Sequence, residues 1–259
     1  MIPVLAYHKI ACGFELGVNS ISPRRFERQI RFVAEQGYTA ITPDDLIHAF
    51  QFHSPLPPRS ILITFDDGYE NFYTDAYPIL KKYGLTATVF VLAGYMGRLN
   101  TWDVQLGLKR PKHLSRDQIQ ALFKDGMGIG SHGLHHRFLT HCHPVEAKAE
   151  LQESKSLLEA LLQHPIHSFA YPYGSANPAT AEMVQATGYS IAFSLEPYRA
   201  ITSESIYCFP RIAIYRCDTS RSFRAKLGLL GKSRFAIECA KNRLINRFAY
   251  LNLLRKWDR

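Results

Sequence analysis

The chain has 259 residues, 46% of them hydrophobic, which is enough to bury a core as one large domain. It contains no apolar run of the ~18 residues that a transmembrane helix needs, and its start lacks the basic and apolar regions of a secretory signal peptide. Residues 221–259 hold eleven bases and two acids, so they carry the whole net charge of +9.

The cysteines and the chain start both favour a cytoplasmic protein. The five cysteines are odd in number and scattered without metal-ligand spacing, which predicts reduced thiols. If Met1 is the natural start, we expect the protein to stay in the cytoplasm.

Strands alternate with helices along the neutral part of the chain. Apolar, β-branched runs predict strands over residues 4–10, 39–41, 60–65, 86–92, 128–132, 167–171, 189–194 and 209–215. Helices are predicted from capping residues, from apolar residues at helical spacing and from glycines that end them. They cover residues 22–37, 42–50, 69–83, 115–126, 144–163 and 178–187. Residues 94–114 are predicted to be a long irregular loop. This order predicts a parallel sheet or barrel.

Polar side chains stand at the carboxyl ends of four of these strands. They are His8, the pair Asp66 and Asp67, His132, and Tyr173. α/β folds place their chemistry at this rim. Convergence of polar groups from four separate strands is poorly explained by structural needs alone, so we expect an active site here.

His132 and His136 have the spacing of a metal-binding pair. With Asp67 they would form a face of two histidines and one carboxylate that leaves positions open for water and substrate. The alternative is an incidental, solvated His-rich turn. The adjacent carboxylates favour the metal site. Its ligands suit Zn²⁺, Co²⁺, Ni²⁺ and Fe²⁺ alike, and Zn²⁺ is expected.

Two further residues suit acid–base work beside such a metal. A metal lowers the pKa of a bound water toward ~7, but a base must still take the proton, and Asp66 is the candidate. Expulsion of an amine needs a general acid, a role that suits a histidine such as His8. The alternative for His8 is a hydrogen-bonded core residue.

Three motifs in this order resemble the polysaccharide deacetylases (NodB homology, carbohydrate esterase family 4). They are Thr64-Phe-Asp-Asp-Gly68, Ser131-His-x-x-x-His136 and Tyr171-Pro-Tyr-Gly174. The resemblance covers residues 1–216 and leaves 217–259 as a basic helical tail. It implies a distorted (β/α)₇ barrel and metal-dependent hydrolysis of N-acetyl groups on amino sugars.

The resemblance also implies roles for individual residues. Asp66 matches the family's base, and Asp67, His132 and His136 match its metal ligands. The backbone N–H of Tyr173 matches a donor to the oxyanion, a role that requires preorganised hydrogen-bond donors.

The chain departs from the family pattern at three places. Ala170 stands where many members carry an arginine, and neither the later Asp/Trp motif nor the C-terminal Leu-x-His is recognisable. The start, Val4–Ile10, resembles a permuted branch that includes poly-N-acetylglucosamine deacetylases, in which an N-terminal histidine takes the acid's place. This supports His8. Arg211 is the candidate to orient Asp66, with a surface arginine as the equal alternative.

Trp102 and Asp103 could line a sugar cleft, because an indole face suits a pyranose ring. Packing of the long loop onto the barrel by Trp102 is the favoured alternative.

The tail from residue 221 onward is predicted to be helical and basic. Apolar residues recur among the bases, namely Phe223, Leu227, Ile237, Leu244, Phe248 and Leu251. Such a helix can lie on an anionic membrane surface, and it can equally pack on the barrel. Nucleic-acid binding is not expected, because no such motif is present.

The leading hypothesis is therefore a metal-dependent hydrolase that removes acetyl from an N-acetylated sugar of a glycan or lipid-linked saccharide. We expect it to act in envelope or exopolysaccharide assembly, at the inner face of the cytoplasmic membrane. One alternative is a deformylase of a lipid-linked aminosugar. Another is a carbohydrate-binding barrel with little turnover, which Ala170 favours and the complete set of Asp66, Asp67, His132 and His136 disfavours.

Overall fold

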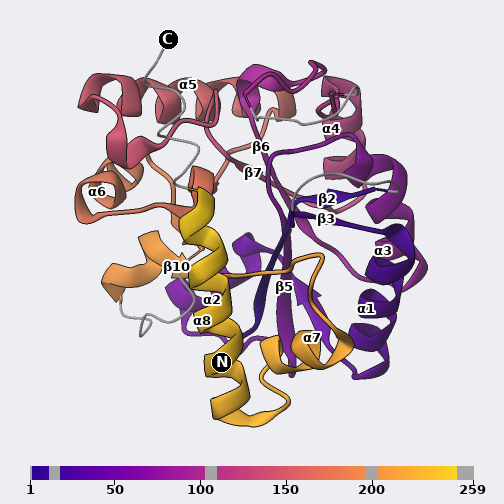
Figure 1. Ribbon diagram of the computed structural model, residues 1–259. Coiled ribbons are helices and arrows are strands. Elements are labelled where there is room, and N and C mark those ends of the chain that lie inside the picture. Colours follow the sequence, from indigo (N-terminus) through magenta and orange to yellow (C-terminus); the bar gives the residue numbers. More distant parts are fainter. Residues whose placement is uncertain (1, 12–17, 103–109, 196–202, 250–259) are drawn as a thin grey trace.

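Parallel strands form the centre of the fold, and helices cover its outside (Figure 1). The computed structural model describes residues 2–11, 18–102, 110–195 and 203–249. The strands in these residues are β1 (Val4–Tyr7), β2 (Lys9–Ile10), β3 (Ser20–Ile21), β4 (Thr39–Ile41), β5 (Ser60–Phe65), β6 (Thr88–Val91), β7 (Gly128–Ser131), β8 (Ser168–Ala170), β9 (Ile191–Ser194), β10 (Phe209–Pro210) and β11 (Ile212–Ala213).

Helices connect most of the strands. The α-helices in the described residues are α1 (Pro23–Glu35), α2 (Pro43–Phe52), α3 (Tyr77–Lys82), α4 (Arg116–Lys124), α5 (Pro144–Leu162), α6 (Pro178–Ala186), α7 (Ser220–Lys226) and α8 (Gly231–Ala249). Shorter turns are the π-turn η1 (Phe72–Ala76) and the 3₁₀ turns η2 (Ala93–Tyr95), η3 (Leu139–His141), η4 (Pro172–Gly174) and η5 (Ser203–Cys208). Within the described ranges, no helix combines the length and apolarity needed to cross a membrane.

The main sheet closes nearly into a barrel. It is parallel and runs in the order β10-β9-β8-β7-β6-β5-β1-β11, with β4 paired to β5. The two ends of this order, β10 and β11, are separated in the sequence by Arg211 alone. Residues 209–213 therefore pair with β9 on one side and with β1 on the other. The predicted barrel with a helical C-terminal extension is confirmed.

The predicted first strand is interrupted at His8. β1 ends at Tyr7, and β2 pairs with β3 in a separate two-stranded sheet. The Asp66 N–H donates to the Tyr7 carbonyl at 2.9 Å, so the ladder between β1 and β5 continues to the last residue of β1. His8 therefore follows directly on the carboxyl end of β1, next to the end of β5.

The helix predicted over residues 69–83 is α-helical only in its second half. Tyr69 forms an antiparallel bridge with His113, the π-turn η1 follows, and α3 comes last. Pro78 has no N–H to donate to the Thr74 carbonyl, as a regular α-helix requires. This missing donor interrupts the α-helical pattern where η1 and α3 meet.

A cluster of buried aromatic rings holds α1 against strands β1 and β5. The rings of Tyr7 and Phe65 stack with centroids 5.2 Å apart, and Phe26 meets both edge-on. The Tyr7 hydroxyl donates to Oε1 of Gln29 at 3.0 Å. These contacts fix the ends of β1 and β5 side by side, directly before the residues of the predicted site.

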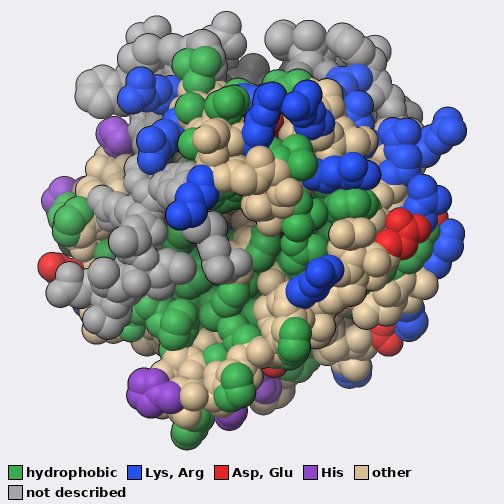
Figure 2. Space-filling model, turned by 90° about the horizontal axis from the view of Figure 1, so that it is seen from below, with side chains coloured by type: hydrophobic (Ala, Val, Ile, Leu, Met, Phe, Trp, Pro, Cys, Tyr) green, Lys and Arg blue, Asp and Glu red, His purple; other side chains and the backbone are tan. Residues whose placement is uncertain are grey.

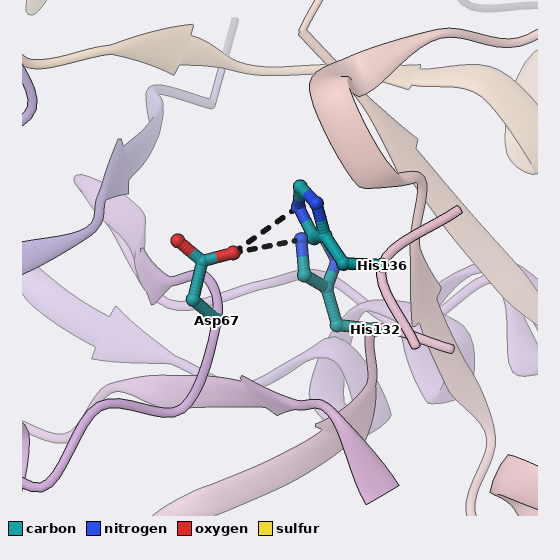
Figure 3. Close-up of side chains that lie close together, drawn as sticks. All are labelled: Asp67, His132 and His136. Carbon is teal, nitrogen blue, oxygen red and sulfur yellow. Dashed lines mark ion pairs between the residues drawn. The ribbon is translucent and has the colours of Figure 1, made fainter. Parts of the chain in front are cut away.

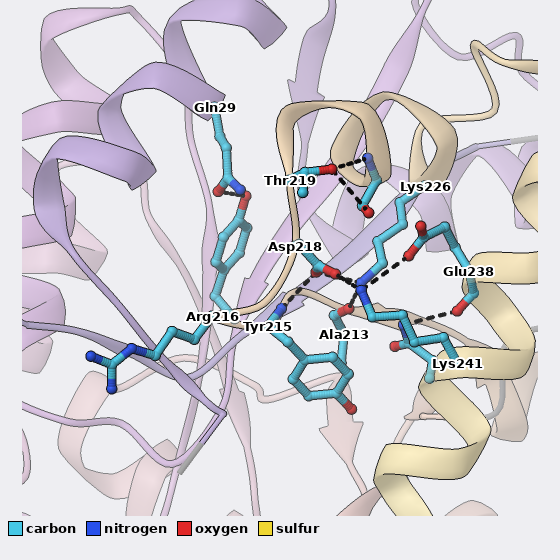
Figure 4. A network of polar contacts seen from close by, with 12 residues as sticks. Gln29, Ala213, Tyr215, Arg216, Asp218, Thr219, Lys226, Glu238 and Lys241 are labelled. Carbon is cyan, nitrogen blue, oxygen red and sulfur yellow. Dashed lines mark hydrogen bonds and ion pairs between the residues drawn. The ribbon is translucent and has the colours of Figure 1, made fainter. Parts of the chain in front are cut away.

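The basic tail folds back onto the barrel. Asp218 accepts hydrogen bonds from Lys226 and from Lys241, and Lys226 also donates to the Ala213 carbonyl at 2.7 Å (Figure 4). The side chains of Asp218 and Lys226 are fully buried. α7 and the inner side of α8 thus pack on the barrel, as one of the two alternatives expected. The domain boundary after residue 216 stays a prediction.

Candidate active site

The carboxyl end of β5 carries two adjacent carboxylates that serve one site. Asp67 takes a left-handed φ of 69°, and Gly68 follows with a φ of 63°. A positive φ is unfavourable for a residue with a side chain. Nδ1 of His113 donates to the Asp67 carbonyl at 2.8 Å and so supports this conformation. Because the strand breaks here, Asp66 and Asp67 do not take the opposite faces that a regular strand would give them.

Three buried side chains converge beside this turn (Figure 3). Nε2 of His132 lies 3.4 Å from Oδ1 of Asp67, and Nε2 of His136 lies 3.3 Å from the same oxygen. The candidate ligand atoms of the three residues all lie within 4.8 Å of one another. His132 follows β7 directly, and His136 takes a left-handed φ of 58°. The structure therefore brings the three predicted metal ligands together.

The surroundings of this group fit a metal ion. Nδ1 of His132 donates to the Ala170 carbonyl at 2.8 Å, so its proton is on Nδ1 and Nε2 presents a lone pair. Oδ1 of Asp67 is buried and has no hydrogen-bond partner among the described residues. Such an oxygen, facing two imidazole nitrogens, is satisfied by a shared cation.

The protonation states of Asp67 and His136 also favour metal binding. Burial would raise the pKa of Asp67, but His132 and His136 outweigh it and hold that pKa well below its usual value. Burial lowers the pKa of His136 to about 4. A carboxylate and a neutral imidazole are the forms that bind metal. Asp67, His132 and His136 can therefore hold one.

Asp66 is paired with a buried arginine from the segment between β10 and β11, where the barrel closes. Nη1 and Nη2 of Arg211 donate to the two carboxylate oxygens of Asp66 at 2.7 and 2.8 Å, and Nη1 also donates to Oγ1 of Thr64 at 3.0 Å. Burial would raise the pKa of Asp66, but Arg211, together with His132 and His8, outweighs it and lowers that pKa. Arg211 is 1% exposed, so the alternative of a surface arginine is wrong. Its role in catalysis stays a prediction.

His8 lies within electrostatic reach of both carboxylates. After burial and the closer partners of each, His8 also lowers the pKa of Asp66 and the pKa of Asp67. Its own Nδ1 is buried without a hydrogen-bond partner in the described part of the chain. The structure thus places His8 in the site, and its role as general acid stays a prediction.

The turn after β8 brings Tyr173 against the metal group. Tyr173 takes a left-handed φ of 58°. Its ring stacks on Phe138 with centroids 3.6 Å apart and meets the ring of His136 at 4.3 Å. Gly174 is needed here, because a Cβ at this position would lie 2.2 Å from Cβ of Leu195. The backbone of Tyr173 is thereby fixed beside the metal ligands.

Trp102 covers one of the predicted ligands. Its ring stacks on His136 with centroids 3.7 Å apart and meets Tyr173 at 6.4 Å. The indole therefore packs against the barrel beside the predicted metal ligands, as the favoured alternative expects, and its contact with a sugar stays a prediction. Asp103 lies outside the described residues.

Comparison of the chain with known proteins identifies its family. The sequence profile of the polysaccharide deacetylases matches residues 53–192, more than half of the chain. The chain belongs to the polysaccharide deacetylase family. Metal dependence is general in this family. The predicted family and the predicted enzyme class, a metal-dependent carbohydrate N-deacetylase, are thereby confirmed.

Individual relatives resemble this deacetylase over most of its length. YxkH of Bacillus subtilis, whose name assigns it to the polysaccharide deacetylases, is 30% identical over 82% of this chain and 71% of the relative. The poly-beta-1,6-N-acetyl-D-glucosamine N-deacetylase of Staphylococcus aureus is 28% identical over 75% of this chain and 68% of the relative. The structure of IcaB from Ammonifex degensii superposes with a TM-score of 0.74 at 25% identity, over 88% of this chain and 96% of that chain.

Two residues of the deacetylase site were missed in the sequence. His113 lies in the loop predicted to be irregular and supports the Asp67 backbone. Glu150 is buried on α5 and accepts hydrogen bonds from the loop between His132 and His136. A signal for Glu150 was present, because it lies on the same side of α5 as the buried Ala147 and Leu151. A charged residue at such a position usually has a buried partner. For His113 no sequence pattern offered a signal.

Proposed function

We propose that this deacetylase removes acetyl groups from N-acetylated amino sugars of a glycan or a lipid-linked saccharide in envelope or exopolysaccharide biosynthesis. The observation that carries the proposal is an ionised Asp66, held by Arg211, directly beside the metal-binding group. A carbohydrate-binding protein would need no such base. The name of the Staphylococcus aureus relative supports the class of sugar.

The proposed metal is one divalent ion held by Asp67, His132 and His136. Zn²⁺ is the first candidate, and Co²⁺, Ni²⁺ and Fe²⁺ suit the same ligands. Bound there, the ion would polarise the acetyl carbonyl and lower the pKa of a bound water toward ~7. Metal analysis of the wild type and of His132→Ala tests the ligand set. Full metal occupancy in His132→Ala would overturn it.

The residues around the metal group have complementary roles in the proposed reaction. Asp66 takes a proton from the attacking water as the new C–O bond forms. The backbone N–H of Tyr173 stabilises the negative charge that develops on the carbonyl oxygen. His8 gives a proton to the sugar nitrogen as the C–N bond breaks, and the products are acetate and a free amine.

The reaction is tested by measuring the acids released. Purified, Zn²⁺-loaded protein is incubated with β-1,6-linked and β-1,4-linked N-acetylglucosamine oligomers and with lipid-linked N-acetylated and N-formylated sugars. We expect acetate release, and loss of that release in Asp66→Asn, which keeps the side-chain shape but cannot act as a base. Release of formate alone would support the deformylase instead. Binding without turnover in the metal-loaded wild type would support a binding protein.

We also propose that α8 brings the enzyme to an anionic membrane. One side of this helix is buried on the barrel, where Cys239 and Asn242 are 2% and 0% exposed. The opposite side leaves Ile237 58% and Leu244 59% exposed. Residues seven apart lie nearly on one line along a helix, so these two form an apolar stripe that faces away from the barrel.

Bases surround this outer stripe. Lys232, Arg234, Arg243 and Arg247 are exposed, and Glu238, the only acid in residues 219–249, is buried. Figure 2, which looks at the end of the molecule that holds α7, shows Lys and Arg gathered with hydrophobic side chains and few acids among them. Anionic lipid fits such a surface. A second copy of the chain would bring arginines against arginines, and nucleic acid would leave the apolar stripe uncovered.

Membrane docking is tested by sedimentation with vesicles that contain phosphatidylglycerol. We expect Ile237→Asp/Leu244→Asp to lower vesicle binding at least about tenfold, since each charge near the lipid surface is worth about 1 kcal/mol. Leu157→Asp on α5, where Leu157 is 39% exposed, is the matched control and should bind as the wild type. Unchanged binding of the α8 variant would contradict the proposal, and a doubled mass in solution would indicate a dimer face.

The proposed place of action is the inner face of the cytoplasmic membrane. The four cysteines that the structure describes, Cys142, Cys208, Cys217 and Cys239, are free thiols, which suits a reducing compartment. Cell fractionation tests this, and recovery of the protein outside the cytoplasmic membrane would contradict it.

A further inference from the structure

Glu150 is a buried carboxylate that the proposed reaction does not use. It lies on α5 and is 4% exposed. Its Oε2 accepts hydrogen bonds from two successive backbone N–H groups, those of Leu134 at 2.9 Å and His135 at 2.8 Å. Its Oε1 lies 2.8 Å from Nδ1 of His135. One side chain therefore holds the loop at three points.

These three points lie between two of the proposed metal ligands. The loop starts at His132, directly after β7, and reaches His136 four residues later. It turns through left-handed conformations at Gly133, with a φ of 86°, and at His136, with a φ of 58°. Such a turn directs successive N–H groups inward, where each needs an acceptor. No strand supplies one here, and Glu150 does.

Glu150 acts on the metal site through this loop and through Arg137, which directly follows His136 and whose Nε lies 3.6 Å from Oε1 of Glu150. Its hydrogen bonds are to Leu134 and His135, neither of which belongs to the candidate ligand group. His135 is also the residue directly before His136. A change in how Glu150 holds His135 would therefore move the His136 ring relative to Asp67 and His132, and so change the spacing of the ligand atoms.

We propose that Glu150 is a positioning residue that sets the metal affinity of this site by fixing the loop between His132 and His136. The proposal rests on the metal site proposed above. It assigns Glu150 neither contact with the metal nor contact with the sugar. Outer residues that orient metal ligands typically contribute 10- to 100-fold in metal affinity.

The test is a titration of the metal-free protein with Co²⁺ alone, read from the absorption of the bound ion. We expect Glu150→Ala to raise the Kd for Co²⁺ about 10- to 100-fold. Glu150→Gln should stay within about threefold of the wild type, because one amide oxygen can still accept both backbone N–H groups. Excess Co²⁺ should restore the activity of Glu150→Ala.

Two further variants separate positioning from general stability. Glu150→Asp keeps the charge but is one methylene shorter, so it cannot reach both N–H groups, and its Kd should also rise about tenfold. Glu159→Ala is the matched control. Glu159 lies on the same helix and accepts from the Ile166 N–H at 2.9 Å, far from the site along the chain. Its removal should lower the Tm and leave the Kd for Co²⁺ unchanged.

The outcomes distinguish this inference from the proposed function. If folded Glu150→Ala or Glu150→Asp binds Co²⁺ as tightly as the wild type, the positioning role is overturned and the metal site stands. If Glu159→Ala weakens Co²⁺ binding as much as Glu150→Ala does, the effect is general stability and the role is again overturned. If the wild type itself binds no Co²⁺, the proposed metal site fails first.

Discussion

Burial and nearby positive charge act on the pKa of Asp66 in opposite directions, and Arg211 is the main source of that charge. Burial alone would favour the neutral acid, which cannot accept a proton. The guanidinium of Arg211, which donates two hydrogen bonds of 2.7 and 2.8 Å, reverses this together with His132 and His8 and lowers the pKa of Asp66. That Arg211 replaces the arginine which many family members carry at the position of Ala170 stays a prediction. A buried pair of this kind is weak evidence for stability, and a perturbed pKa beside a metal group marks a candidate functional residue.

Removal of Arg211 should therefore show in the pH profile. In Arg211→Met, burial acts on Asp66 against His132 and His8 alone, so the pKa of Asp66 rises. The base is then protonated at a higher pH, and the acid limb of the kcat/KM profile moves upward in pH. We expect kcat at neutral pH to fall about 10²-fold or more, within the range for loss of a general base.

Arg211→Lys is the graded control for this experiment. It keeps the charge but loses the paired geometry of the guanidinium, so its acid limb should move less. Metal content should be unchanged in both variants. A folded, metal-loaded Arg211→Met with the wild-type acid limb would show that Arg211 does not control Asp66.

His8 is the second residue whose role can be separated by kinetics. If it protonates the departing nitrogen, His8→Ala should lower kcat on an amide substrate about 10²- to 10⁴-fold. An activated ester, whose leaving group needs less protonation, should be affected far less. Metal content should not change. Equal loss on amide and ester, or loss of the metal, would show that His8 is a ligand or a structural residue.

At the scale of whole elements, α8 combines two kinds of surface. Its inner side is tied to the barrel through Lys241, which pairs with the carboxylate of Asp218. The same carboxylate forms a fully buried pair with Lys226 of α7 (Figure 4). Burial lowers the pKa of Lys226, and Asp218 opposes that effect. A buried charge left without its partner is strongly destabilising. The attachment of the tail thus depends on Asp218.

Asp218→Ala should accordingly destabilise the folded protein by about 3–5 kcal/mol, measured as the free energy of unfolding in urea. The exposed pair of Lys82 and Glu27, at 2.6 Å, is the matched control. Glu27→Ala should lower the free energy of unfolding far less, because water screens an exposed pair. Similar losses in the two variants would show that the buried network does not hold the tail.

The sequence predicted those elements and site residues that depend on neighbouring residues in the chain. Asp66, Asp67 and His132 follow apolar runs directly, so a short stretch of sequence places each at a strand end. The partners that hold them are not local. Glu150 lies 15 residues from His135, and Arg211 lies 145 residues from Asp66. Only the folded chain decides such pairings, since many buried or basic residues fit equally well by type.

At the scale of the whole molecule, one metal would join two parts of the barrel. Asp67 comes from the end of β5, and His132 and His136 come from the end of β7, with β6 between these strands. A ligand that binds only the folded state stabilises it in proportion to the logarithm of its concentration over Kd. The metal should therefore contribute to stability as well as to chemistry.

Removal of the metal should lower the melting temperature. At a free metal concentration about 100 times Kd the stabilisation is about 2.7 kcal/mol, which for a chain of this size corresponds to about 5–10 °C. Thermal unfolding with and without a chelator measures this. The same chelator should leave the Tm of His132→Ala unchanged. An equal shift in that variant would locate the stabilising metal elsewhere.

The segment that closes the barrel makes the proposed activity depend on a complete barrel. Residues 209–213 form the last sheet strands along the described part of the chain, and they hold Arg211 against Asp66. A chain synthesised only up to residue 210 would already contain every proposed metal ligand and His8. Its Asp66, however, would lack the partner that keeps it ionised. Hydrolysis would thus reach its full rate only after the barrel has closed, and truncated chains would hold metal while cutting sugar far more slowly.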